Sequence, residues 1–209
     1  MKPSNTSLKQ KIGLTGGIGA GKTTVSNRLR MLGARIIDAD EISRTALTTY
    51  GPCYSAVIEL FGTEILRQDA SIDRAAVAAR IFSDESMRIE LNNIVHPYVL
   101  DTMHAECNTI LEKEPKAMVV FDIPLLIECG AYRDMDYNIV IIADDLARIH
   151  RICKRNGISA KEARARIQAQ IPQDEQCTYA DFVIDNSGSL DMLYRQTDAI
   201  YAKIRGGIL

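Results

Sequence analysis

The stretch at residues 16–23, Gly-Gly-Ile-Gly-Ala-Gly-Lys-Thr, is the most informative part of this 209-residue sequence. It fits the pattern G-x-x-x-x-G-K-[ST], in which glycines let several backbone N–H groups point at phosphate oxygens. The lysine of this pattern reaches the β- and γ-phosphates of a nucleotide, and the hydroxyl that follows it ligates Mg²⁺. The stretch therefore predicts a phosphate-binding loop, or P-loop, in which Lys22 and Thr23 have these two roles.

The residues on either side of the loop have the pattern that it requires. Residues 11–15 form a short, largely apolar run that predicts a buried strand. After the loop, Val25, Leu29 and Leu32 lie on one face of a helix, and Gly33 is suited to end it. A helix that begins at the loop adds positive potential where phosphates bind. The sequence thus predicts a nucleoside triphosphate site.

Composition limits the other possibilities. The net charge is −2, so no global field attracts nucleic acid or an anionic membrane surface, and no apolar stretch has the length of a membrane span. Five scattered cysteines without a C-x-x-C pair argue against a disulfide framework and a zinc site, and indicate the reducing cytoplasm. We expect a cytoplasmic protein with small-molecule partners, with a monomer favoured over an oligomer.

Short buried strands alternate with helices, which predicts an α/β fold with an open parallel sheet and helices on both faces. We expect strands at residues 12–15, 35–38, 117–122, 137–143 and 182–185, and helices at residues 23–32, 146–155, 160–170 and 190–204. The segment between the second and third strands is too long for a simple crossover. It carries helical stretches at residues 39–49, 53–61, 74–82 and 85–111, which predict an inserted helical subdomain that either binds substrate or is purely structural.

Carboxylates follow two of the expected strands. Asp38 ends the second strand and Asp40 lies two residues beyond it, so that both would lie near the P-loop, at the carboxyl edge of the sheet. Kinases that act on an alcohol need a carboxylate there, to accept the hydroxyl proton or to hold Mg²⁺, but either residue is also suited to be the N-cap of the next helix. Asp122 ends the third strand as in a Walker B strand, and Glu128 beyond it would meet a substrate hydroxyl, an arginine or solvent.

Basic residues gather in one segment: Arg148, Arg151, Lys154, Arg155, Lys161, Arg164 and Arg166. Two arginine-rich helices joined at residues 156–159 predict a lid that closes over a triphosphate and brings guanidinium groups to the transferring phosphoryl group. A solvated helix face is the alternative interpretation. The polar turn after the last strand places Asn186 where it could hydrogen-bond adenine.

Taken in order, these motifs resemble the dephospho-coenzyme A kinase family over about residues 12–200. The segments that carry the resemblance are G-L-T-G-G-I-G-A-G-K-T-T-V from Gly13, I-D-A-D ending at Asp40, D-R at residues 73–74, I-V-H-P ending at Pro97, P-L-L-I-E ending at Glu128, K-R-N-G-I-S ending at Ser159, A-R-I-Q-A-Q ending at Gln170 and A-D-F-V-I-D-N-S-G ending at Gly188. The resemblance implies ATP-dependent phosphorylation of the ribose 3′-hydroxyl of dephospho-coenzyme A, the last step of coenzyme A biosynthesis. ATP and Mg²⁺ are the implied cofactors.

The resemblance also implies roles for individual residues. Asp40 would be the general base, with Asp38 as a second carboxylate, and the catalytic set would also contain Lys22, Arg151 and Arg155. The nucleotide site would comprise Gly17, Gly19, Ala20, Gly21, Lys22, Thr23, Thr24, Arg166 and Asn186, with Thr23 as the metal ligand. The acceptor site would comprise Asp38, Arg74, Arg80, His96, Leu125 and Glu128.

The expected domain plan is a disordered tail at residues 1–10 and a single P-loop kinase domain at residues 11–205, followed by a disordered end. Its core would comprise residues 11–40, 116–145 and 180–205, its acceptor-binding insertion residues 41–115 and its lid residues 146–179. The sequence departs from the family at Thr23, Arg148 and Asn156, where Ser, Gln and Asp are commoner. A kinase for another acceptor and a nucleotide-dependent switch are the alternatives, and the lack of an N-K-x-D tetrapeptide argues against a GTPase switch.

Overall fold

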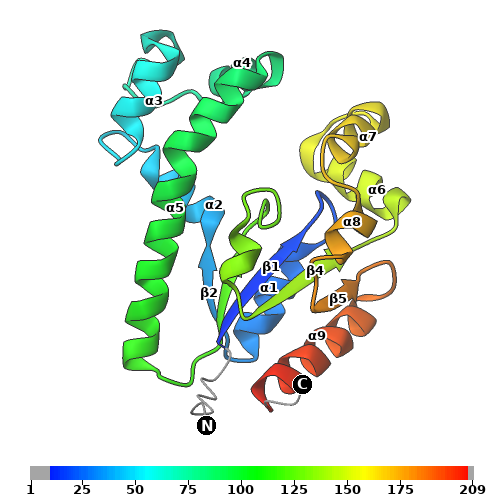
Figure 1. Cartoon of the computed structure of the whole chain (residues 1–209). Coiled ribbons are helices and arrows are strands. Elements are labelled where there is room, and N and C mark those ends of the chain that lie inside the picture. The colour runs from blue at the N-terminus through cyan, green and yellow to red at the C-terminus, as the bar shows by residue number, and fades with distance from the viewer. Residues whose placement is uncertain (1–9, 207–209) are drawn as a thin grey trace. The chain divides into compact units, whose positions relative to one another are not determined.

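A five-stranded sheet organises the computed structural model, which describes residues 10–206 (Figure 1). Its strands are β1 (Lys11–Gly16), β2 (Arg35–Asp38), β3 (Val119–Asp122), β4 (Tyr137–Ile142) and β5 (Phe182–Asp185), in the spatial order β2-β3-β1-β4-β5. β1 pairs in parallel with both β3 and β4, and β4 pairs in parallel with β5. The predicted parallel α/β sheet is therefore confirmed, and each of its five strands lies where a strand was expected.

The described chain divides into two compact units. The first contains residues 10–37 and 109–206, and the second is Asp38–Asn108. Helices of the first unit are α1 (Lys22–Met31), α6 (Asp145–Asn156), α7 (Ala160–Gln168), α8 (Gln173–Cys177) and α9 (Leu190–Arg205), with a 3₁₀ turn at Ala131–Asp134. The second unit contains α2 (Ala39–Ala46), α3 (Tyr54–Phe61), α4 (Arg74–Ser83), a 3₁₀ turn at Thr63–Ile65 and most of α5 (Glu85–Lys113).

The core of the first unit lies between the sheet and two helices. Ile12 and Leu14 of β1 and Ile139 of β4 are fully buried, and they share one apolar cluster with Leu29 of α1 and Leu193 of α9. Burial of each such side chain stabilises the fold by about 1.5–3 kcal/mol. The strands are apolar along their length because both faces of a parallel sheet are covered.

The end of α2 and the presence of α8 differ from the sequence-based expectation. α2 ends at Ala46 rather than at residue 49, because the chain turns at Thr48 and Tyr50 takes a positive φ of 64° before the Gly51-Pro52 pair. α8 was not predicted; it has five residues, begins after Pro172 and has no apolar repeat long enough to indicate a helix.

The two predicted disordered ends lie mostly outside the described residues, at 1–9 and 207–209. Gln10, which was assigned to the tail, is hydrogen-bonded in the structure: its carbonyl accepts from the backbone N–H of Val119 at 2.8 Å, and its own N–H donates to Asp136 Oδ2 at 2.8 Å. Gly206 likewise donates its N–H to the carbonyl of Ala202 at 2.9 Å, at the end of α9.

Candidate active site

The P-loop connects β1 directly to α1. Gly19 and Gly21 have positive φ angles of 79° and 104°, a backbone conformation that L side chains rarely adopt, and Gly21 is the N-cap residue of α1. The loop is closed by a hydrogen bond of 2.9 Å from the N–H of Ala20 to the carbonyl of Gly17. α1 starts at Lys22, so the N–H groups of Lys22 and Thr23 belong to a first helical turn, where an α-helix has no acceptors of its own for them. This arrangement suits an anion.

Lys22 is held by a carboxylate at the end of the neighbouring strand. Its ammonium forms an ion pair and hydrogen bond with Asp122, whose side chain is only 5% exposed. The chain beyond Asp122 is fixed to β1, because the hydroxyl of Thr15 donates to the carbonyl of Pro124 at 3.0 Å. The structure thus brings the P-loop lysine and the Walker B-like aspartate together, an ion pair that the sequence analysis did not predict.

Two more of the predicted site residues bind the backbone of the P-loop. Arg151 on α6 donates from Nη1 to the carbonyls of Gly19 at 3.1 Å and Ala20 at 3.3 Å. Its Nη2 donates to the carbonyl of Asn186 at 2.9 Å, and the buried amide of Asn186 donates to the carbonyl of Ala20 at 2.6 Å. These donors hold the carbonyls of the loop. Asn186, expected beside adenine, therefore contacts the P-loop itself in the structure.

Arg155 and Arg166 are not part of this group. Both are exposed; Nε of Arg155 donates to the side chain of the adjacent Asn156 at 2.9 Å, and Arg166 lies near Glu162 on its own helix. The basic segment therefore divides into residues bonded to the P-loop and residues that face solvent. Thr23 is exposed at the start of α1, and Thr24 donates its N–H to the carbonyl of Gly21 at 3.0 Å.

The two aspartates at the end of β2 and just beyond it have different environments. Asp38 is the N-cap of α2, since its Oδ1 accepts from the N–H groups of Asp40 at 2.8 Å and Glu41 at 3.2 Å. Asp40 lies in the first turn of α2 and is exposed. One of the two interpretations left open by the sequence, a helix-capping role, therefore applies to Asp38.

The candidate acceptor residues of the second unit are partly engaged within that unit. Arg80 donates to the carbonyl of Phe61 at 2.5 Å and pairs with Glu64 at 3.0 Å. Arg74 is exposed and makes a 3.3 Å hydrogen bond to the carbonyl of Arg44. His96 is half-buried on α5, and burial lowers the pKa of its imidazole, which favours the neutral form.

The candidate acceptor residues of the first unit follow β3. Leu125 is 37% exposed, unusually so for a leucine next to the buried Leu126 and Ile127. Glu128 is exposed as a whole residue. Neighbouring atoms nevertheless shield its carboxyl group from water in part, and this desolvation raises the pKa of the carboxyl group. A leucine and a carboxyl group in this state offer a ligand both apolar surface and a hydrogen-bonding group.

Metal-binding side chains are sparse in the described part of the chain. Within residues 10–206 no three His, Cys, Asp or Glu side chains are grouped so that they could hold a metal ion. The hydroxyl of Thr23 and the carboxylate of Asp122 are both oxygen donors, of the type that Mg²⁺ prefers, and Mg²⁺ bound with substrate phosphates needs only one or two protein ligands. The donors near the P-loop therefore fit a magnesium–nucleotide complex better than a free metal site.

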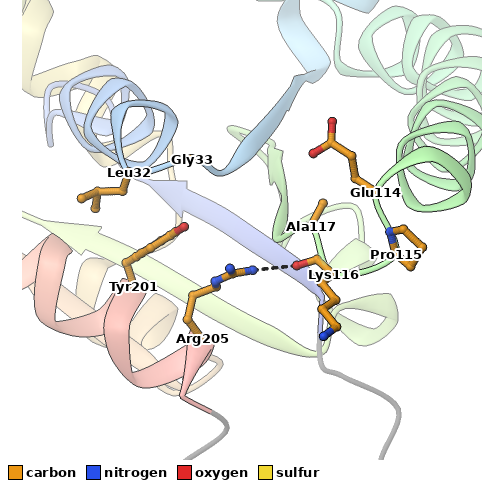
Figure 2. Close-up of a pocket in the computed structure, with 8 residues that line it drawn as sticks. All are labelled: Leu32, Gly33, Glu114, Pro115, Lys116, Ala117, Tyr201 and Arg205. Carbon is orange, nitrogen blue, oxygen red and sulfur yellow. Dashed lines mark hydrogen bonds between the residues drawn. The ribbon is translucent and has the colours of Figure 1, made fainter.

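A cavity of about 600 Å³ lies in another part of the first unit, between the ends of α1 and α9 and the chain that leads into β3 (Figure 2). Leu32, Gly33, Ala117 and Tyr201 line it, and Arg205 reaches across to donate to the carbonyl of Lys116 at 2.6 Å. Leu32 and Gly33 follow α1, Ala117 precedes β3, and Tyr201 and Arg205 lie near the end of α9. The cavity therefore lies at the amino edge of the sheet, whereas the P-loop follows the carboxyl end of β1. The cavity is therefore separate from the candidate active site.

Two residues at the P-loop were missed as site residues. Arg148 was named as a member of the basic segment and as a departure from the family, and Gln170 only within a motif, yet both contact the loop in the structure. Arg148 is only 3% exposed. Its residue type does not predict this burial, because arginines usually face solvent. The one available signal was the position of Arg148 three residues before Arg151, on the same helix face.

Comparisons with known proteins identify the family of this chain. A family model described as dephospho-CoA kinase matches residues 10–192. The dephospho-CoA kinase of Geobacillus kaustophilus is 43% identical over 189 residues, which cover 90% of this chain and 94% of that protein. The crystal structure of TT1252 from Thermus thermophilus has a TM-score of 0.78 at 33% identity and covers 93% of this chain and 97% of that one. The dephospho-CoA kinase from Campylobacter jejuni has a TM-score of 0.70 at 27% identity, covering 95% and 98% of the two chains. The chain belongs to the dephospho-CoA kinase family.

Proposed function

We propose that this chain transfers the γ-phosphoryl group of ATP to the ribose 3′-hydroxyl of dephospho-coenzyme A, giving coenzyme A and ADP. Family membership identifies the substrates and places the reaction last in coenzyme A biosynthesis. The observation that carries the proposal within the molecule is the P-loop, in which Lys22 begins α1 directly after a left-handed Gly21.

Lys22 would move from Asp122 to the β- and γ-phosphates when ATP binds. The nucleotide has several negative charges against the single one of Asp122, and the first turn of α1 adds its own positive potential. Gly17, Gly19, Ala20, Gly21 and Thr24 would form the rest of the phosphate cradle with their backbone. In the free enzyme, the ion pair keeps the lysine at the site.

Asp40 is proposed as the general base that accepts the 3′-hydroxyl proton. The division of roles between the aspartates supports this choice, because the Oδ1 of Asp38 is already engaged with the start of α2 while Asp40 is exposed. Loss of the proton leaves the oxygen nucleophile free to attack the γ-phosphorus, and the ADP oxygen is the leaving group. Asp38 would hold α2, and with it Asp40, in a fixed orientation.

The arginines would neutralise charge on the transferring phosphoryl group. Arg155 and Arg166 are exposed on α6 and α7, so their guanidinium groups are accessible to a triphosphate. Arg151 already lies against the loop and would act at shorter range, with Asn186 beside it. Stabilisation of this kind accounts for most of the catalysis in phosphoryl transfer.

Mg²⁺ is part of the proposal, with Thr23 as its ligand and Asp122 available as a second oxygen donor once Lys22 has moved. When bound, the ion would offset the negative charge of the nucleotide phosphates. The acceptor would be held by Arg74, Arg80, His96, Leu125 and Glu128. The arginines suit its phosphate groups, and Leu125 suits an apolar part of the ligand.

The test is ADP release from ATP and Mg²⁺ with dephospho-coenzyme A, AMP, adenosine or shikimate as the acceptor. We expect turnover only with dephospho-coenzyme A, and coenzyme A as the product. Preferred turnover of another acceptor would leave a P-loop kinase but reject this substrate. ATP binding without turnover of any acceptor would instead favour a nucleotide-dependent switch.

We also propose a cytoplasmic monomer. The described residues contain no helix long and apolar enough to cross a membrane, and Cys53, Cys129, Cys153 and Cys177 carry free thiols, which suits a reducing compartment. Light scattering at several protein concentrations tests the oligomeric state, and a stable mass near twice 23.2 kDa would reject the monomer.

A further inference from the structure

One residue of the P-loop, Ile18, contacts the segment of α6 and α7, a helical hairpin, in three ways: through its side chain, its backbone N–H and its backbone carbonyl. Its side chain packs against the small apolar cluster of this hairpin, which consists of Ile149, Ile152 and Ala163. The cluster is separate from the main core of the unit, so Ile18 is the point at which the P-loop joins it. A loop residue whose side chain fills the core of another element ties the positions of the two together.

Both backbone polar groups of Ile18 are also taken by side chains of this segment. The N–H of Ile18 donates to Oε1 of Gln170 at 2.7 Å, and its carbonyl accepts from Nε of Arg148 at 3.0 Å. The side chain of Arg148 is only 4% exposed, and its charge is balanced by Asp145 at 3.0 Å. A buried guanidinium without such partners would be strongly unfavourable, so the contact with the loop is a fixed part of the structure.

The glycines of the loop are matched to these side chains. A Cβ atom on Gly17 would lie 2.5 Å from Nη2 of Arg148 and 3.5 Å from Oε1 of Gln170. A Cβ atom on Gly19 would lie 2.9 Å from the carbonyl oxygen of Arg148 and 3.1 Å from Cγ1 of Ile152. The outer side of the P-loop is therefore in direct contact with α6, while the start of α1 is left for phosphate.

We propose that Ile18 couples the P-loop to the α6–α7 hairpin, and that Gln170 and Arg148 are positioning residues that hold the loop in its phosphate-binding conformation before nucleotide arrives. The inference rests on the proposed nucleotide role of the P-loop. Because of this coupling, the hairpin and the P-loop move together. Any movement that closes the hairpin arginines over the nucleotide is then linked to the conformation of residues 16–22. Gln170 and Arg148 touch neither reacting group, so their effect is on nucleotide affinity.

The main test replaces Gln170 with methionine, which has a similar length but only a weakly accepting sulfur. The matched control is Gln168→Met, an exposed glutamine two residues away at the end of α7. Three quantities are measured on the full-length enzyme: the Kd of ADP with Mg²⁺ by calorimetry, the KM values of ATP and dephospho-coenzyme A together with kcat, and the exchange rate of the Ile18 amide by NMR.

We expect Gln170→Met to weaken ADP binding and raise the KM of ATP by about five- to tenfold, the equivalent of one hydrogen bond. The Ile18 amide should exchange faster, whereas kcat and the KM of dephospho-coenzyme A should stay within about twofold of the control. A purely structural defect would instead lower kcat and the melting temperature and change both KM values. Equal ADP affinity and equal Ile18 exchange in the two variants, or tighter nucleotide binding by Gln170→Met, would overturn the proposal.

A second variant, Ile18→Ala, tests the side-chain contact and remains informative if Gln170→Met does not fold. It should weaken ADP binding by a similar factor, and unchanged affinity would also overturn the coupling. Binding of ADP and amide exchange need no acceptor. If the wild-type enzyme fails to phosphorylate dephospho-coenzyme A, the proposed reaction fails while these comparisons still decide the role of Ile18.

Discussion

The P-loop region of the first unit and the candidate acceptor residues of the second unit differ in what their polar side chains do. Around the P-loop, Arg148, Arg151 and Asn186 donate hydrogen bonds to consecutive loop carbonyls, and Lys22 is paired with a buried aspartate. In the second unit, Asp40 and Arg74 are exposed. The predicted phosphate site is thus already held in place by protein contacts, whereas two of the candidate charges in the second unit, Asp40 and Arg74, face solvent.

This difference indicates how each region would respond to mutation. Where side chains hold backbone groups in place, a substitution alters the site before any ligand binds and also affects stability. Where side chains are exposed, a substitution removes an interaction that forms only with the ligand, so activity changes and stability does not. The predictions below are arranged to separate these two classes of effect.

The largest effect is expected for Lys22→Ala. Loss of the ammonium group removes stabilisation of the phosphoryl charge and should lower kcat/KM by about 10³-fold. It also leaves Asp122 buried without its partner, which should reduce stability by up to about 3 kcal/mol. The measurements are steady-state kinetics and urea denaturation, with Lys113→Ala, an exposed lysine at the end of α5, as the control.

A double variant separates the two parts of this effect. Lys22→Ala combined with Asp122→Asn should recover most of the lost stability, because no buried charge remains, but it should recover no activity. If the double variant regains turnover, the lysine is not needed for phosphoryl transfer and the P-loop assignment is wrong.

The next effect concerns Asp40 and Asp38. Asp40→Asn should lower kcat by about 10²–10⁴-fold, as expected for the loss of a general base, while ADP affinity and melting temperature stay unchanged. Asp38→Asn should retain the N-cap, since asparagine caps a helix as well as aspartate does, and Asp38→Ala should cost about 1 kcal/mol of stability. Kinetics, calorimetry and denaturation of the three variants test this division. Full activity in Asp40→Asn with loss in Asp38→Asn would exchange the roles of the two residues.

Most of the fold could be predicted from local sequence because most of its elements have a local signal. Strands buried on both faces are continuous apolar runs, and the P-loop has its own pattern of glycines followed by Lys22. α8 has neither signal, with one buried side chain, Gln176, among its five residues. A short helix of this kind depends on its neighbours rather than on its own sequence.

The site could be predicted in part, for a related reason. Sequence motifs indicated some of the residues that gather at the P-loop, such as Arg151 and Asn186, but not which backbone groups they bind. Asn186 is an example: its residue type suits adenine and a loop carbonyl equally, and only the folded chain places its amide 2.6 Å from the carbonyl of Ala20. Likewise, Asp38 and Asp40 are equivalent N-cap candidates until the start of α2 is known. Sequence motifs therefore do not predict contacts between residues that are distant in the sequence.

The smallest expected effect compares two candidate acceptor residues, one from each unit, through the pH dependence of stability. Desolvation raises the pKa of the Glu128 carboxyl group, so between its usual value near 4.3 and the raised value the folded state holds more protons than the unfolded state. Stability should then fall as pH rises through this window. Burial lowers the pKa of His96, so below about 6.5 the unfolded state takes up the proton first, and stability should fall as pH decreases.

Glu128→Gln and His96→Gln should each flatten one side of the pH profile. Glu128→Gln should raise the free energy of unfolding slightly at pH 7 and leave it nearly unchanged near pH 4, where the wild-type carboxyl group is largely protonated in both the folded and unfolded states. His96→Gln should have its stabilising effect only below about pH 6.5. Urea denaturation at intervals from pH 4 to pH 8 measures both. Profiles parallel to that of the wild type would mean that neither group titrates differently in the folded and unfolded states. The desolvation of Glu128 and His96 would then have no effect on the stability of the fold.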